Sequence, residues 1–200
     1  YKFIEQDGYP ITAKVDMHLS SDDKANLVRS MGICSEGFAD VFDVIKPDLV
    51  VVLGDRYELL PIVSAALVMR IPVAHISGGD VTEGAIDDEV RNAVSMMSTL
   101  HFPGVIDSAK NLHRMLGAEK NVFAVGEPGL DSFLRYKLWD KETTAKELNL
   151  DMQKKWCLVT LHPETKISLE ENINMVQSLY ASMQQTNDIQ YVITKATLTL

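Results

Sequence analysis

Apolar positions recur along the chain in two alternating patterns, one of helical spacing and one of short unbroken runs. Phe38, Val41, Phe42 and Ile45 fall at i, i+3, i+4 and i+7, which is one face of a helix. The run Leu49–Leu53 is continuous and rich in valine. Such a run is typical of a strand that is buried on both faces of a parallel sheet. The sequence therefore predicts a helix followed by a buried strand.

Capping and breaking residues set the expected limits of these elements. Ser20, Ser21 and Asp22 form an N-cap cluster before a helix over 23–31, and Gly32 follows its last periodic residue. Pro47 ends the next helix. Further helices are expected at Leu59–Arg70, along an apolar stripe over 86–100, at Ile106–Leu116, at Leu130–Tyr136, and from a capping box at Ser168 and Glu171 to about Gln184. Further strands are expected at Val73–Ile76, Leu100–Phe102, Val122–Val125, Trp156–Leu161 and Ile189–Thr194.

The alternation of strands and helices predicts an α/β fold with parallel, Rossmann-like sheets. A charged stretch with few large apolar residues, Lys137–Lys155, indicates a boundary. We expect a Rossmann-like domain over 1–140 that lacks its first strand, a linker over 141–155, and the start of a second Rossmann-like domain over 156–200. The chain begins without Met and ends without a closing helix, so both ends look cut from something longer.

Composition narrows the classes of protein that this chain can be. A net charge of −9 over 200 residues disfavours a nucleic-acid binder, which needs a basic face. The longest mostly apolar stretch, Leu59–Met69, is shorter than the roughly 20 residues that span a bilayer, and no signal peptide is visible. Two distant cysteines suggest buried thiols rather than a disulfide framework or a zinc site. We expect a cytoplasmic protein with no membrane partner and no metal or cofactor.

Polar and glycine-rich residues follow four of the expected strands. They are Gly54–Glu58, Ser77–Gly84, Gly126–Gly129 and His162–Thr165. In open parallel sheets, ligands bind beyond the carboxyl ends of the strands. The sequence therefore predicts that candidate chemistry gathers along one edge of the sheet.

Each candidate residue also has an ordinary structural explanation. Asp55 could act as a general base or cap the following helix. Asp87 and Arg91 are one helical turn apart, so they are either site groups or a surface pair. The pair Gly78–Gly79 allows close approach of a ligand, but glycine pairs are also common in turns. A histidine at a strand end, His162, is as often structural as functional, whereas the position of His75 inside a strand favours a core histidine.

Taken together, these segments resemble the hydrolysing UDP-N-acetylglucosamine 2-epimerases of the sialic-acid type. The resemblance lies in Lys46–Glu58, in Ile71–Asp80, in Thr82–Asp87 with Arg91, and in Val159–Pro163. It covers most of the chain and is strongest between residues 46 and 132. It implies a glycosyltransferase-B-like arrangement of two Rossmann-like domains, present here only in part.

The resemblance also implies a reaction and a set of site residues. Such enzymes expel UDP from UDP-N-acetylglucosamine through a 2-acetamidoglucal and release N-acetylmannosamine. Asp55, Asp87 and His162 match the catalytic positions of the family. The implied substrate-binding residues are Arg56, Ser77, Gly78, Gly79, Asp80, Glu83 and Arg91. Many relatives carry Glu where this chain has Ser77, so the third acid–base group is unassigned, with Asp80 and Glu83 as candidates.

Three alternatives stay open at this stage. The substrate could be UDP-2,4-diacetamido-2,4,6-trideoxyglucose instead. The same fold could serve a glycosyltransferase, or a catalytically silent module that binds a nucleotide sugar. The resemblance further implies a UDP-sugar as partner and a homo-oligomer, either dimer or tetramer. Because the family's first strand and its uridine-binding segments are missing, we expect a polypeptide of these 200 residues alone to have no epimerase activity.

Overall fold

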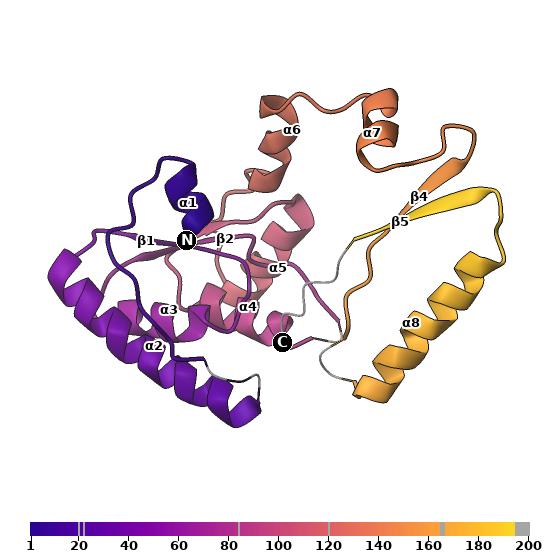
Figure 1. Cartoon of the computed structure of the whole chain (residues 1–200). Coiled ribbons are helices and arrows are strands. Elements are labelled where there is room, and N and C mark those ends of the chain that lie inside the picture. The colour runs from indigo at the N-terminus through magenta and orange to yellow at the C-terminus, as the bar shows by residue number, and fades with distance from the viewer. Residues whose placement is uncertain (20, 22, 84, 120, 165–166, 195–200) are drawn as a thin grey trace. The chain divides into compact units, whose positions relative to one another are not determined.

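The computed structural model describes residues 1–19, 21, 23–83, 85–119, 121–164 and 167–194 (Figure 1). The chain forms two compact units. The first holds Tyr1–Thr82 and Asp87–Glu127, and the second holds Glu83, Ala85 and Ile86 with the described residues from Pro128 on. The domain boundaries expected at residues 140 and 155 stay a prediction.

A parallel sheet forms the centre of the first unit. Its described strands run in the order β1 (Val50–Leu53), β2 (Val73–Ile76) and β3 (Leu100–Phe102). Val122 adds a parallel bridge to His101, and the N–H of Phe123 donates to the His101 carbonyl at 2.9 Å. The strand expected at Val122–Val125 is therefore present as an extended segment with a single bridge. The predicted α/β class with parallel sheets is confirmed.

Helix α2 (Lys24–Ile45) corrects one prediction, because it runs unbroken through Gly32. The apolar stripe continues past the glycine, with Cys34 and Phe42 buried on one face. One glycine costs a helix only about 1 kcal/mol, which this packing offsets. The N-cap of the helix is Asp23, whose side chain accepts from the N–H of Asn26. Ser20 and Asp22 of the expected cap cluster lie outside the described residues.

The other helices of this unit are α1 (Lys2–Gln6), α3 (Leu59–Val68), α4 (Asp87–Met96) and α5 (Ile106–Leu116). The stripe expected over 86–100 ends early because Leu100 belongs to β3. Helices α2, α3 and α4 pack their apolar faces against the sheet, with Phe42, Val63 and Val94 in the core.

The expected burial of β1 on both faces is wrong for the described chain. Val52 points into the core and is 6% exposed, whereas Val51 and Leu53 on the other face are 59% and 60% exposed. Successive side chains of a strand point to opposite faces, so one face of β1 packs into the core while the other face is exposed. A valine-rich run therefore predicted the strand correctly but not the cover on its second face.

The second unit contains the parallel pair β4 (Lys155–Val159) and β5 (Ile189–Ile193), joined through α8 (Leu169–Gln184). The predicted capping box is confirmed, because the Ser168 and Glu171 side chains each bond the other's backbone N–H. The shorter elements are a 3₁₀ turn at Pro128–Asp131, α6 (Ser132–Arg135) and α7 (Lys141–Glu147). None of the helices in the described part of the chain has the length and apolar character needed to cross a membrane.

Candidate active site

Arg91 is the centre of a polar cluster at the carboxyl end of β1. It lies on α4 and is only 5% exposed. Its guanidinium donates to the carboxylates of Asp55 and Asp88, to the Asp80 carbonyl at 3.0 Å and to the Thr82 hydroxyl at 2.9 Å. A buried guanidinium with a carboxylate on each side is well satisfied, since its five N–H groups match carboxylate geometry. The structure thus brings together Asp55, Asp80 and Arg91 of the expected site.

A buried histidine holds the loop that carries Asp55. The Nε2 atom of His75 lies 2.8 Å from the Gly54 carbonyl, and its Nδ1 lies 2.9 Å from the Ser95 hydroxyl. A carbonyl oxygen can only accept, so Nε2 carries the proton and Nδ1 accepts from Ser95. His75 and Ser95 are both 0% exposed. The expectation of a core histidine is confirmed, and Ser95 is a contributor that the sequence did not reveal.

Burial lowers the pKa of His75 and of His101 below the usual 6.5. In the unfolded chain both imidazoles take up a proton near pH 6.5, whereas in the fold they resist protonation. The unfolded state therefore binds more protons below pH 6.5, and stability falls as the pH falls.

We expect the free energy of unfolding to decrease between pH 6.5 and 5, by at most about 1.4 kcal/mol per pH unit for each histidine. Replacing the buried His101 with Leu should make this dependence shallower, because one titrating group is lost. Denaturant unfolding at several pH values measures the slope of the unfolding free energy against pH. The control is His18→Gln, because His18 is exposed. An unchanged slope in His101→Leu would contradict the assignment.

The glycine pair after β2 packs tightly against the protein itself. A Cβ atom on Gly78 would lie 2.8 Å from the Ser95 hydroxyl and 2.9 Å from Nδ1 of His75. Gly79 has φ +84°, and a Cβ there would lie 2.8 Å from Cγ of Leu112 on α5. Both glycines therefore have a packing reason, and their expected contact with substrate stays a prediction.

We expect Gly79→Ala to lower the free energy of unfolding by about 2–4 kcal/mol, because a strained φ and overpacking against α5 add together. Gly117→Ala is the matched control. It also has a left-handed φ, of +66°, but no atom lies within 4 Å of the added Cβ. That variant should lose only about 1 kcal/mol. Equal losses in the two variants, measured by chemical denaturation, would show that the contact with α5 is unimportant.

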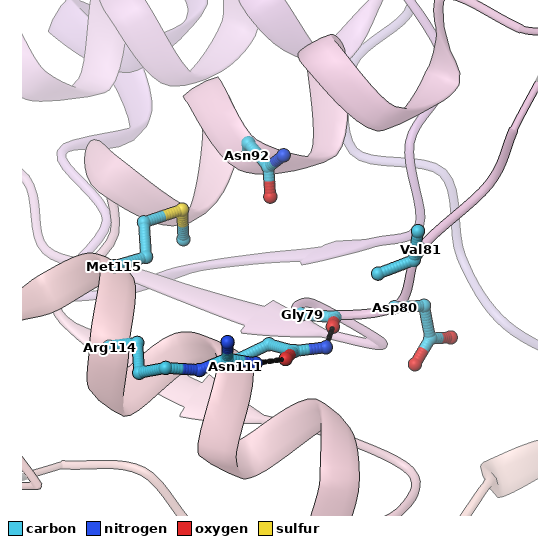
Figure 2. Close-up of a pocket in the computed structure, with 7 residues that line it drawn as sticks. All are labelled: Gly79, Asp80, Val81, Asn92, Asn111, Arg114 and Met115. Carbon is cyan, nitrogen blue, oxygen red and sulfur yellow. Dashed lines mark hydrogen bonds between the residues drawn. The ribbon is translucent and has the colours of Figure 1, made fainter.

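A cavity of about 390 Å³ lies beside the same loop (Figure 2). Gly79 and Asp80 line it from the loop, Asn92 from α4, and Asn111 and Arg114 from α5. The Asn111 amide donates to the Gly79 carbonyl at 2.9 Å. The Asp80 carboxylate accepts from Ser108. Two expected site residues therefore border this cavity and are fixed by α5.

The remaining expected residues have the following positions. Arg56 forms a two-point hydrogen bond with Glu58, at 2.6 and 3.1 Å, and this bond raises the pKa of the arginine. Asp87 opens α4. Ser77 has φ +61°, and its hydroxyl donates to the carboxylate of Glu127 at 3.1 and 3.2 Å.

Two expected residues belong to the second unit. Glu83 is one of them, and Gly84 beside it lies outside the described residues. His162 is exposed and comes shortly after β4. The segment that follows it is held by buried Asn172 on α8, which exchanges two hydrogen bonds with the backbone of Glu164, at 2.9 and 3.0 Å. Within the described ranges, no three His, Cys, Asp or Glu side chains gather as a metal site would need.

Comparison with known proteins shows which families of proteins this chain is similar to. Residues 1–198 match the family model described as UDP-N-acetylglucosamine 2-epimerase. The chain is 36% identical to the GDP/UDP-N,N'-diacetylbacillosamine 2-epimerase (hydrolyzing) of Campylobacter jejuni, over 98% of this chain and 50% of that protein. It is 35% identical to the UDP-N,N'-diacetylbacillosamine 2-epimerase (hydrolyzing) of Legionella pneumophila, over 80% of this chain and 42% of that protein.

A solved structure confirms the fold class. The UDP-GlcNAc 2-epimerase of Neisseria meningitidis, bound to UDP-GlcNAc, matches with a TM-score of 0.78 at 21% identity. The match covers 98% of this chain and 54% of that one. The chain spans about half the length of the curated relatives it matches.

Proposed function

Because the chain belongs to the UDP-N-acetylglucosamine 2-epimerase family, we propose that the intact protein is a hydrolysing 2-epimerase of a UDP-linked 2-acetamido sugar. The observation that most strongly supports this proposal is the buried Arg91, which holds Asp55 at the carboxyl end of β1. Open parallel sheets bind their ligands at this edge. The pair supplies a fixed carboxylate for proton transfer where a sugar nucleotide would lie.

The proposed reaction has two stages, elimination of UDP and then addition of water. A base removes the proton from C2 while the C1–O bond breaks and UDP leaves with the bonding electrons, which forms a C1=C2 double bond. Water then adds its hydroxyl to C1, and a proton returns to C2 on the opposite face of the ring. The products are UDP and the free 2-epimeric sugar, with one water consumed.

Proton removal on one face and proton return on the other require more than one acid–base group. We assign this work to Asp55 and Asp87, and we assign His162 to the departing diphosphate. Substrate contacts are assigned to Arg56, Ser77, Gly78, Gly79, Asp80, Glu83 and Arg91. The position of Asp55 beside a buried arginine and that of Asp87 in the first turn of the same helix support these roles.

Two substrates are proposed in order of support. The names of two curated relatives, at 36% and 35% identity, favour UDP-N,N'-diacetylbacillosamine, which is the UDP-2,4-diacetamido-2,4,6-trideoxyglucose named above as the alternative substrate. The family description and the ligand named for the Neisseria structure favour UDP-N-acetylglucosamine as the second candidate. The two sugars differ at C4 and C6, so the enzyme must distinguish an acetamido group from a hydroxyl at C4 and a methyl from a hydroxymethyl group at C6.

The test is release of nucleotide by the intact protein from three donors. These are UDP-N,N'-diacetylbacillosamine, its GDP analogue and UDP-N-acetylglucosamine. We expect the highest kcat/KM with the first donor. In deuterated water the free sugar should carry deuterium at C2, which a simple hydrolase or glycosyltransferase would not introduce. Absence of nucleotide release from all three donors would overturn the proposed function.

A further inference from the structure

We infer that Glu127 supplies a carboxylate that touches the sugar ring in the proton-transfer steps, and that Ser77 orients it. This inference rests on the proposed function and names an additional group for it. The resemblance leaves one acid–base group unassigned, since Ser77 stands where many relatives carry Glu. The contacts of Ser77 identify the side chain that brings a carboxylate to that position.

Glu127 lies at the same sheet edge as the other candidates. It follows the extended segment that continues the sheet beyond β3, where the N–H of Val125 donates to the Pro103 carbonyl at 3.2 Å. Ser77 follows β2, so β3 lies between the two residues. Neighbouring strands are about 4.8 Å apart, which places the two chain segments roughly 10 Å apart. The Ser77 hydroxyl nevertheless lies 3.1 and 3.2 Å from the two carboxylate oxygens of Glu127.

Gly104 makes this crossing possible. It lies two residues after the end of β3, and a Cβ atom placed on it would lie 2.6 Å from Oε2 of Glu127. Any side chain at this position would therefore push the carboxylate away. The Glu127 side chain occupies the space that the glycine leaves and reaches across the end of β3 to Ser77. The sequence thus builds a specific path for this carboxylate to the end of β2.

The carboxylate of Glu127 is also placed to meet a ligand. Glu127 is exposed, and Ser77 is partly exposed. Within the described residues, the Ser77 hydroxyl is the one hydrogen-bond partner of this carboxylate, so other lone pairs face solvent. One carboxylate oxygen of Asp55, by contrast, accepts a hydrogen bond from the buried guanidinium of Arg91. A carboxylate that is oriented by one hydroxyl and otherwise open can exchange a proton with a sugar carbon or with water.

The first test compares Glu127→Gln with wild type in the intact protein, using the donor that wild type turns over best. We expect kcat to fall by about 10²–10⁴-fold, the usual contribution of an acid–base group, with KM changed less than about threefold. The exposed Glu36→Gln on α2 is the matched control and should keep wild-type kcat. If wild type releases no nucleotide, the proposed function fails. If wild type is active and Glu127→Gln keeps its kcat within threefold, only the assignment of Glu127 fails.

The second test moves the carboxylate instead of removing it. Because the two side chains touch, a carboxylate at position 77 should reach the place that Glu127 now fills. We expect the double variant Ser77→Glu/Glu127→Ser to regain at least about tenfold in kcat over Glu127→Ser alone. A double variant that keeps its melting temperature but is no more active than Glu127→Ser would overturn the inference. Recovery would also exclude a merely structural role for Glu127.

Discussion

Replacing Asp55 with asparagine is expected to lower kcat of the intact protein by about 10²–10⁴-fold, because an amide cannot take up or deliver the proton. The amide oxygen can still accept from the Arg91 guanidinium, so the loop after β1 should keep its place. Nucleotide release and deuterium incorporation at C2 measure the effect. Both should fall together, since both depend on transfer of the C2 proton.

Asp107→Asn is the control for Asp55→Asn. Asp107 lies on α5, where its exposed side chain pairs with Lys110 at 2.7 Å. This variant changes the net charge by the same amount and should keep wild-type activity. If Asp55→Asn releases nucleotide at a rate within threefold of wild type, Asp55 does not transfer the proton. The proton transfer would then have to be assigned to another carboxylate of the candidate site.

Replacing Arg91 with methionine is expected to lower the free energy of unfolding by about 2–4 kcal/mol, since partly buried carboxylates lose their partner. The side chains of Asp55 and Asp88 are each 29% exposed, so water compensates only in part. The loop around Asp80 and Thr82 loses two further hydrogen bonds. A loss of this size corresponds to a fall in melting temperature of roughly 5–10 °C. Activity should fall as well, because Asp55 is no longer held.

Arg29→Met provides the comparison for Arg91→Met. Arg29 is exposed on α2, so its loss should change the melting temperature by less than about 2 °C. The melting temperature of Arg91→Lys should lie between those of Arg91→Met and Arg29→Met, because an ammonium group keeps the charge but cannot match the planar fork of the guanidinium. If Arg91→Met has the same melting temperature as wild type, the buried ion pair does not stabilise the fold in the way described.

The strands and most helices followed from periodicity, since local spacing determines which face of an element is apolar. The prediction failed where the outcome depended on packing. Gly32 looked like a helix end, but the buried face formed by Cys34 and Phe42 carries α2 through it. Val51 and Leu53 looked buried, yet burial depends on cover that a strand's own sequence does not record.

The candidate site was predicted in part for the same reason. The rule that ligands bind at strand ends predicts Asp55, and the helical spacing from Asp87 predicts Arg91. Their contact with each other joins residues 36 positions apart, which no local pattern indicates. The sequence marks Glu127 only as one of the polar residues after a strand, because its contact with Ser77 spans 50 positions. The roles of all these residues in catalysis stay predictions.

The link from Ser95 through His75 to the Gly54 carbonyl has a consequence for mutational surveys. Ser95 lies inside α4 and is sealed from solvent, so no substrate can reach it. Its hydroxyl nevertheless donates to Nδ1 of the imidazole whose Nε2 anchors the residue before Asp55. Substitutions at position 95 would therefore lower activity as substitutions in the candidate site do, although their origin is a hydrogen bond lost from a histidine in the protein interior.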